Sequence, residues 1–342
     1  MMKKKIPVFM IGAGRIGFKL EFDKKRVKPA SHYGMWTQDK KFDLQGIAEK
    51  KKFSKEYLKK IGTNIKIYSD YKKMIKLNRP KVVSISTWKD THFEISNFCI
   101  DNGVKIVILE KPLANSISEA KKLISKLKIK KTKVIVNHRR RFDTDIIKLQ
   151  SKINNGIIGD ILQVSSFYVY GLLTTGTHLI DTLRMLLKEK CGEIIQVSGY
   201  KNLSNNFKPK DDENYDAVLK FKNGIISTIQ NLDMKSYDNF DIHIFGTKGK
   251  ILISGIGRDI FHYKVIKSPE HSGFTELVKK PVQLNKSKPR LQFLKLSQNA
   301  YDCLMKNHKP LCSAFDSYID MVIINKIIES EKKNSKLLKI NL

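Results

Sequence analysis

The stretch Val104-Lys-Ile-Val-Ile-Leu-Glu-Lys-Pro-Leu113 joins an apolar run directly to two charged residues and a proline. An apolar run without polar alternation is typical of a strand that is covered on both faces, as in a parallel sheet. Glu110, Lys111 and Pro112 then stand where the strand leaves the sheet. Ligands of open parallel sheets bind outside the carboxyl ends of the strands, so chemistry is expected at this edge. Taken alone, the two charges are better explained as a solvated strand end.

A glycine-rich stretch near the N-terminus supplies a second feature of such a sheet. Val8-Phe-Met-Ile-Gly-Ala-Gly-Arg-Ile-Gly17 runs from a predicted strand into a predicted helix that ends at about Phe22. The first two glycines permit a tight turn and the close approach of a pyrophosphate, and the third lets the helix pack on the strand. The context of strand, turn and helix supports this interpretation. The residues expected to hold a dinucleotide here are Gly12, Gly14, Arg15, Ile16 and Gly17.

A third stretch, Thr174-Thr-Gly-Thr-His-Leu-Ile-Asp181, lies downstream. In order and spacing, the three stretches resemble the glucose-fructose oxidoreductase, inositol dehydrogenase and MocA superfamily of sugar and polyol dehydrogenases. The resemblance spans nearly the whole chain, and its most specific part is the glutamate-lysine-proline motif after a glycine fingerprint. It implies an α/β fold with an N-terminal Rossmann doubly wound parallel sheet. A C-terminal α+β domain with a large, mainly antiparallel open sheet should follow.

The length of 342 residues supports two domains, because one hydrophobic core rarely serves so long a chain. Strands and helices alternate up to about Asn137, and after Gly159 strands separated by turns follow, with Asn223-Gly224 as a hairpin signal. We expect a cofactor domain over residues 1–141, a substrate and oligomerisation domain over 142–310 and a helical segment over 311–342. The resemblance implies that the last helix packs back on the cofactor domain. It also implies a homodimer or homotetramer with contacts through the wide sheet.

The acidic residue expected after the second strand is Glu49, because Leu44–Glu49 has the pattern of that strand. Glu49 can accept hydrogen bonds from the adenosine ribose and would repel a 2′-phosphate, which favours NAD. Three lysines follow at positions 50–52 and can offset that repulsion, so NADP stays possible. Residues 23–42 are interpreted as an inserted loop near the cofactor. Within it, Ser31 and His32 are better explained by ordinary loop polarity than by ligand contact.

Two further loops follow predicted core strands. Thr87-Trp-Lys-Asp-Thr-His92 comes after the strand at residues 81–87, and relatives usually have proline where this chain has Trp88. Trp88 is either part of the wall around the nicotinamide or a packing residue, with packing slightly favoured. Arg139 to Arg141 follow the strand at 133–137; they can hold a phosphate or carboxylate, anchor the domain junction or form ion pairs. Further residues expected at the cofactor are Thr87, Trp88, His92, Glu110 and Lys111, and Arg141 is a candidate for the substrate.

The residues from Gly176 to Leu187 form an amphipathic helix when projected at 100° per residue. One continuous apolar stripe contains Leu179, Ile180, Leu183, Leu186 and Leu187. His178, Asp181 and Thr182 fall on the opposite side. Because Asp181 follows His178 by three residues, both can reach one ligand. On its own this pattern fits a solvated helix face, and only its combination with the other two stretches favours a functional site.

The resemblance implies oxidation of a secondary alcohol or the reverse reaction, on a sugar, a nucleotide sugar or a cyclic polyol. His178 would accept the hydroxyl proton, and Lys111 would stabilise the negative charge that develops on the oxygen. Asp181 would hold a neighbouring hydroxyl or orient the imidazole, with Thr174 and Thr175 beside the substrate. No metal is required. Several relatives have aspartate where this chain has Thr174, so a dinucleotide-binding regulatory or accessory protein without turnover is the alternative.

The composition limits which classes of partner are expected. The net charge of +32 invites nucleic acid, but the excess is mostly lysine spread over every predicted element, and no nucleic-acid motif accompanies it. We therefore expect a solvated lysine-rich surface without a specific nucleic-acid partner. No apolar run has the length of a membrane span. The four cysteines show neither metal-ligand spacing nor a disulfide framework, so a cytoplasmic protein without metal is expected.

Overall fold

The computed structural model describes residues 4–205, 212–285 and 291–342. Contacts between its residues divide the chain into two units. The first contains Met1–Thr144 and Pro289–Tyr318, and the second contains Asp145–Lys288 and Ile319–Leu342. The boundary expected after residue 141 therefore lies near the first observed one. The expected segments 142–310 and 311–342 differ from the observed division, because residues 289–310 belong to the first unit and residues 319–342 to the second.

The first unit is built around a six-stranded parallel sheet in the order β3-β2-β1-β4-β5-β6. All residues of β4 and β5 are buried, including Ser84 of β4, and the unbroken apolar run of β5 predicts its burial. The doubly wound parallel sheet is therefore confirmed. Its strands are β1 (Ile6–Ile11), β2 (Phe42–Ala48), β3 (Lys66–Tyr68), β4 (Val82–Ile85), β5 (Ile106–Leu109) and β6 (Lys133–Val136).

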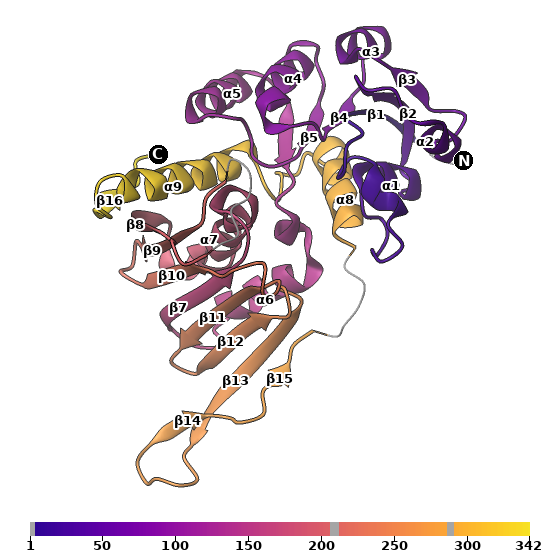
Figure 1. The fold of residues 1–342 in the computed structure, drawn as a ribbon. Coiled ribbons are helices and arrows are strands. Elements are labelled where there is room, and N and C mark those ends of the chain that lie inside the picture. The colour runs from indigo at the N-terminus through magenta and orange to yellow at the C-terminus, as the bar shows by residue number, and fades with distance from the viewer. Residues whose placement is uncertain (1–3, 206–211, 286–290) are drawn as a thin grey trace. The chain divides into compact units, whose positions relative to one another are not determined.

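Helices cover both faces of this sheet. The neighbours α4 and α5 pack on one face, and α1 and α8 contact each other on the other (Figure 1). The late helix α8 belongs here because it packs against α1 and β5. The helices of the first unit are α1 (His32–Gln38), α2 (Lys55–Lys60), α3 (Tyr71–Asn78), α4 (Lys89–Asp101), α5 (Ile117–Ile129) and α8 (Gln292–Met305), with short 3-10 turns η1 (Lys19–Phe22) and η2 (Arg139–Phe142).

The helix predicted directly after the glycine turn is wrong in position. Residues 14–22 form only turns and η1, and the crossover helix between β1 and β2 is α1, inside the segment interpreted as a loop. The carbonyls of Ile16 and Gly17, which a continuing α-helix would bond with residues 20 and 21, accept from the N–H groups of His32 and Tyr33 instead. Ser31 caps α1 by accepting a hydrogen bond from the Gly34 N–H at 3.0 Å.

The second unit is built around a ten-stranded, mainly antiparallel sheet. Its strand order is β14-β13-β12-β11-β7-β10-β9-β8-β16, with β15 paired to β13, and among the described strands of this sheet only β7 and β10 pair in parallel. Asn223-Gly224 turns between β9 and β10, with Gly224 at φ +96°. The strands are β7 (Ile161–Tyr168), β8 (Ile194–Lys201), β9 (Tyr215–Phe221), β10 (Ile226–Asn231), β11 (Phe240–Gly246), β12 (Gly249–Ser254), β13 (Asp259–Lys267), β14 (Thr275–Leu277), β15 (Val282–Gln283) and β16 (Leu338–Lys339).

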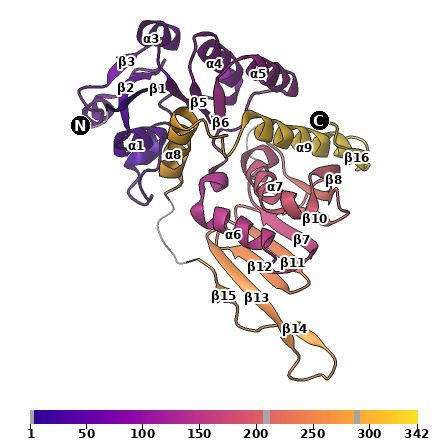
Figure 2. The same cartoon turned by 180° about the vertical axis from the view of Figure 1, so that it is seen from behind.

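Three helices accompany this sheet, and α7 packs against β7. They are α6 (Thr144–Asn154), α7 (Thr177–Cys191), which follows a π-helical turn η3 (Leu172–Gly176), and α9 (Ala314–Glu331), whose residues up to Tyr318 belong to the first unit. The hairpin of β13 and β14 extends beyond the other strands (Figures 1 and 2). Within the residues that the structure describes, every helix is too short or too polar to cross a lipid bilayer.

Candidate functional site

In the glycine turn after β1, two glycines are closely packed against the chain and one faces open space. Gly12 has φ +89°, and a Cβ there would lie 2.8 Å from Thr87 Cγ2. At Gly17 a Cβ would lie 2.5 Å from both the Gly12 carbonyl oxygen and Ser86 Oγ. Gly14 has no atom within 4 Å of the corresponding position, and it is exposed. Gly12 and Gly17 therefore permit close packing, and Gly14 leaves the backbone open to a phosphate group.

Glu49 lies against this turn. Its Oε2 accepts a hydrogen bond from the Ala13 N–H at 2.7 Å, and its Oε1 accepts one from the Lys51 N–H at 3.0 Å. Glu49 directly follows the last residue of β2, which is the position of the ribose-binding acid in dinucleotide folds. The turn and this carboxylate fit the pyrophosphate and the adenosine ribose of NAD. Arg15 is exposed and Ile16 half-buried beside them.

Glu110, at the end of β5, is held by two residues that the sequence analysis did not select. Its Oε1 lies 2.8 Å from His32 Nε2 and accepts a hydrogen bond from Asn137 Nδ2 at 2.6 Å. Burial disfavours the carboxylate, but the hydrogen bond and charge of His32, the amide of Asn137 and the charge of Lys111 outweigh it. The pKa of Glu110 is therefore lowered. Asn137 directly follows β6, and this position at the carboxyl end of a strand is the sequence feature that could have identified it as a site residue.

His92 ties together the two loops that flank this edge. The Lys111–Pro112 peptide bond is cis, and the Pro112 carbonyl oxygen lies 2.7 Å from His92 Nδ1. On the other side of the ring, Nε2 lies 3.2 Å from the Thr87 carbonyl oxygen. Burial lowers the pKa of His92 even though both carbonyls favour its charged form. The position of His92 thus indicates that it fixes the loops that carry Thr87 and Lys111.

Trp88 does not pack against the described chain. Its side chain is 85% exposed, so the packing interpretation that the sequence slightly favoured is wrong. The residue precedes α4 as its N-cap, at the carboxyl end of β4. A tryptophan at a helix N-cap gives no local signal for burial or exposure, because either outcome depends on neighbouring loops.

The strand order brings the first-unit candidates to one edge of the sheet. Proceeding along β2, β1, β4, β5 and β6, the residues that follow each strand are Glu49, the glycine turn, Thr87 with Trp88, Glu110 with Lys111, and Asn137. The strand order changes direction between β1 and β4, and ligands bind outside the carboxyl ends of strands at such a point. The candidate cofactor site is this edge.

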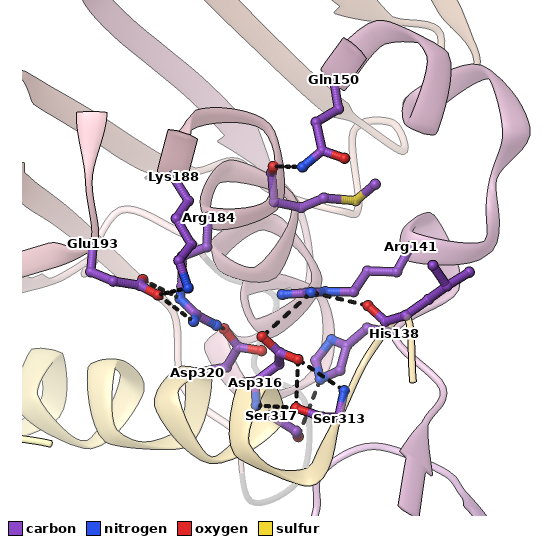
Figure 3. A network of polar contacts seen from close by, with 12 residues as sticks. His138, Arg141, Gln150, Arg184, Lys188, Glu193, Ser313, Asp316, Ser317 and Asp320 are labelled. Atoms are coloured by element: carbon purple, nitrogen blue, oxygen red, sulfur yellow. Dashed lines mark hydrogen bonds and ion pairs between the residues drawn. The ribbon is translucent and has the colours of Figure 1, made fainter. Parts of the chain in front are cut away.

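Arg141 is engaged by the C-terminal segment of the same unit. Its Nη1 donates to the Leu311 carbonyl at 3.2 Å and lies 3.6 Å from Asp316 Oδ1 (Figure 3). Asp316 in turn accepts a hydrogen bond from Ser313 Oγ at 2.6 Å. Of the roles that the sequence left open for Arg141, these contacts favour anchoring and ion pairing.

The second unit contains the remaining candidates, on α7 and the turn before it. The predicted apolar stripe is confirmed, since its five residues are fully buried. The opposite side is less open than expected: Asp181 is 1% exposed, and Thr182 donates its hydroxyl to the His178 carbonyl at 2.6 Å. His178 is half-buried. Lys111 belongs to the first unit, whereas Thr174, Thr175, His178 and Asp181 belong to the second.

A buried carboxylate that the sequence analysis missed holds the turn in front of α7. Asp212 accepts hydrogen bonds from the N–H groups of Leu173, at 2.8 Å, and Thr174, at 2.7 Å. Gly171 is required beside it, because a Cβ there would lie 2.0 Å from the Asp212 Cγ. Asp212 is separated from Thr174 by 38 residues, so no local pattern could reveal this contact.

Comparisons with known proteins agree with this architecture. Residues 6–138 match the model of an oxidoreductase family with an NAD-binding Rossmann fold. Residues 169–252 match the C-terminal domain model of the same Gfo/Idh/MocA family. Together the two matches cover more than half of the chain.

Individual relatives are distant. An uncharacterized oxidoreductase of Escherichia coli is 25% identical over 63% of this chain and 64% of its own length. The myo-inositol 2-dehydrogenase of Thermotoga maritima is 26% identical over 72% of this chain and 75% of its own. The chain thus aligns with just under two thirds of the first of these relatives.

The fold is also found among solved structures. A levoglucosan dehydrogenase in complex with NADH and levoglucosan has a TM-score of 0.80 and 19% identity, covering 99% of this chain and 100% of that one. The parallel sheet with its glycine turn, the antiparallel second unit and the two family models lead to one conclusion. The chain belongs to the Gfo/Idh/MocA oxidoreductase family, with an NAD-binding Rossmann domain followed by the family's C-terminal domain.

Proposed function

We propose that this protein transfers a hydride between NAD and a secondary hydroxyl or keto group of a sugar, a nucleotide sugar or a cyclic polyol. The observation that carries the proposal is the edge of the first sheet. There an open glycine turn and the Glu49 carboxylate lie in line with Glu110 and Lys111. These features, which fit a dinucleotide and two charged residues beside it, follow the carboxyl ends of the strands, where parallel sheets bind their ligands.

The proposed catalytic residues are Lys111, His178 and Asp181. Bound NAD supplies the hydride acceptor. In the oxidation, His178 takes the hydroxyl proton while Lys111 stabilises the negative charge developing on that oxygen; such proton transfer contributes about 10² to 10⁴ in rate. The fixed Glu110 directly precedes Lys111, and the charge of Lys111 contributes to the lowered pKa of Glu110. Because Asp181 is buried, we favour its role in orienting the imidazole over direct contact with substrate.

We propose NAD as the cofactor over NADP. The carboxylate of Glu49 accepts two backbone hydrogen bonds and is therefore fixed beside the glycine turn, where its charge would repel a 2′-phosphate on the adenosine ribose. The side chains of the three lysines at 50–52 are exposed, so solvent screens their charge more than that of the half-buried Glu49.

The substrate class is proposed from the relatives and from the second unit. Curated relatives include inositol dehydrogenases, and a solved structure of similar fold holds levoglucosan. Thr174 is exposed and Thr175 partly so, on a turn that Asp212 fixes, which suits contact with a polyhydroxylated ligand. Membership of an oxidoreductase family favours turnover over the accessory role that Thr174 raised.

We also propose a cytoplasmic homodimer or homotetramer that associates through the ten-stranded sheet. Along the strands of this sheet, fully buried side chains alternate with half-buried ones. The half-buried side chains form one face of the sheet. Phe167 packs on His243, and Lys250 lies 5.0 Å from the centroid of the Phe245 ring on this face. The four cysteines are free thiols and buried, as suits a reducing compartment. Light scattering on wild type and Phe167→Asp measures the assembly; an unchanged mass would contradict this interface.

The decisive experiment has two steps. Purified protein is titrated with NADH and NADPH at physiological salt, and then assayed for NAD reduction with a panel of polyols and sugars that includes myo-inositol and levoglucosan. Lys111→Ala should abolish turnover and leave NADH affinity nearly unchanged. Lys105→Ala is the matched control, because Lys105 is exposed just before β5, at the opposite end of the strand. Full activity of Lys111→Ala would refute its role, and absence of saturable NADH binding would refute the whole proposal.

A further inference from the structure

Trp88 combines an exposed indole with a rigid backbone. No other large apolar side chain in residues 4–205, 212–285 and 291–342 is as exposed as its 85%. The Thr91 N–H and hydroxyl both donate to the Trp88 carbonyl, at 3.0 and 2.8 Å, and Thr91 Oγ1 also bonds Thr87 Oγ1 at 2.7 Å. The Ser86 N–H donates a hydrogen bond to the carbonyl oxygen of Ile11, at the end of β1, at 2.8 Å. A fixed backbone that presents a large aromatic ring to solvent is suited to stacking on a ligand.

The strand order indicates which part of a dinucleotide reaches Trp88. Glu49 after β2 fits the adenosine ribose, and the turn after β1 fits the pyrophosphate. The next strand in the same direction is β4, whose end carries Trp88, and the one after it is β5 with Lys111. Adjacent strands lie about 4.8 Å apart, so Trp88 is one strand beyond the phosphates. A cofactor lying along this edge with its nicotinamide directed toward Lys111 would pass the end of β4.

The two redox forms of the cofactor differ at that end. The oxidised nicotinamide ring carries a positive charge and the reduced ring does not. The face of an indole attracts cations more strongly than any other aromatic side chain does. Positive charge around the site repels the oxidised ring, since the chain carries a net charge of +32 and Lys111 lies at the end of the neighbouring strand. The attraction of the indole for the oxidised ring would oppose this repulsion.

We propose that the indole of Trp88 stacks on the nicotinamide ring and favours its oxidised form. The inference rests on the proposed NAD site and adds a redox preference to it. This chain has a π-face at the end of β4, so its ratio of NAD⁺ to NADH affinity depends on one side chain. Trp88 is thus a specificity-determining residue for the redox state of the cofactor.

The test compares wild type with Trp88→Leu, which keeps apolar bulk and removes the π-face. An indole stacked on oxidised nicotinamide produces a charge-transfer absorption band at the long-wavelength side of the tryptophan spectrum. Wild type should show this band, saturating with added NAD⁺, and Trp88→Leu should lack it. NAD⁺ affinity should fall between about twofold and thirtyfold in the variant, with a smaller change for NADH. An unchanged affinity ratio, or a band that persists in Trp88→Leu, would overturn the proposal.

The only other tryptophan provides the control. Trp36 is 1% exposed and donates its Nε1–H to Ser84 Oγ at 2.9 Å, so Trp36→Phe should keep the band. Acrylamide should quench the Trp88 emission in cofactor-free protein, and NAD⁺ should protect it. Protection already present without NAD⁺ would mean that another copy of the chain covers Trp88, and the proposal fails. If neither NAD⁺ nor NADH binds, the proposed function fails with it; if both bind and the variant behaves like wild type, only the role of Trp88 fails.

Discussion

At Glu110, burial and nearby charge have opposite effects on the carboxyl group. Burial disfavours its carboxylate, and the contacts with His32 and Asn137 reverse that effect, so its pKa is lowered. A carboxyl group whose pKa is lowered by folding stabilises the protein above its ordinary titration range. That contribution is lost as the pH falls through the lowered pKa.

We expect His32→Phe to lower the free energy of unfolding by about 1–3 kcal/mol near neutral pH. Phenylalanine preserves the edge contact with the Phe293 ring but removes one of the two partners of the Glu110 carboxylate. The deficit should shrink in acid, where Glu110 is protonated in both proteins. Urea denaturation above and below the carboxyl titration range measures it.

Tyr33→Phe is the matched control for His32→Phe. It is the next residue of α1, and it loses a neutral hydrogen bond from Tyr33 Oη to the Lys60 carbonyl, 2.9 Å long. The loss of unfolding free energy caused by Tyr33→Phe should not depend on pH over the same range. An equally pH-independent deficit in His32→Phe would contradict the assigned role of the Glu110 charge.

At the scale of elements, the glycine turn separates stability from binding. Gly17→Ala forces a methyl group within 2.5 Å of the Gly12 carbonyl and should cost about 1–3 kcal/mol of stability. Gly14→Ala meets no atom within 4 Å and should fold as stably as wild type, but its methyl group projects where a phosphate should bind. Thermal unfolding and NADH titration of both variants measure the two effects. If Gly14→Ala bound NADH as tightly as wild type does, the proposal that this turn binds the phosphates would be refuted.

Helix α7 is fastened to α9 by a buried ion pair. Arg184 is 1% exposed, and its Nη1 donates to Asp320 Oδ1 at 2.7 Å, while Nε donates to Glu193 Oε2 at 3.1 Å (Figure 3). Burial opposes the charge of Arg184, but the two carboxylates outweigh it and raise its pKa. The pair joins α9 to the helix that presents His178, since α7 carries both His178 and Arg184.

Asp320→Ala should destabilise the protein by about 3–5 kcal/mol, because it leaves a buried guanidinium short of a partner. Glu56→Ala is the control, since it breaks an exposed ion pair with Lys60 and should change stability by less than about 0.5 kcal/mol. Chemical denaturation followed by circular dichroism compares them. Equal effects for the two variants would show that the Arg184 pair does not contribute through burial.

At the scale of the whole molecule, the excess of positive charge acts against compactness. The chain has 65 lysines and arginines and 33 aspartates and glutamates, so repulsion between like charges is not balanced. Adding NaCl from about 0.01 M to 0.15 M shortens the Debye length from about 30 Å to 8 Å. The thermal midpoint should therefore rise with NaCl over this range. A midpoint that stays constant or falls would mean that the lysines are already compensated locally.

The sequence by itself determined the strands of the first sheet, the glycine turn, the hairpin at Asn223-Gly224 and the apolar stripe of α7, but not the strands β13 to β16. Each of these depends on residues that are close together in the chain, whose periodicity and turn chemistry are local properties. Family resemblance further indicated which polar residues to select. It could not show whether those side chains would be exposed or buried.

Only the tertiary structure decided what surrounds the selected residues. Glu110 and His32 are 78 positions apart, and their contact depends on α1 replacing the helix expected after the glycine turn. The burial of Asp181, the position of His92 between two carbonyls and the exposure of Trp88 likewise depend on elements distant in sequence. Local pattern fixes which face of an element is apolar, whereas hydrogen-bond partners and exposure depend on how elements pack in three dimensions.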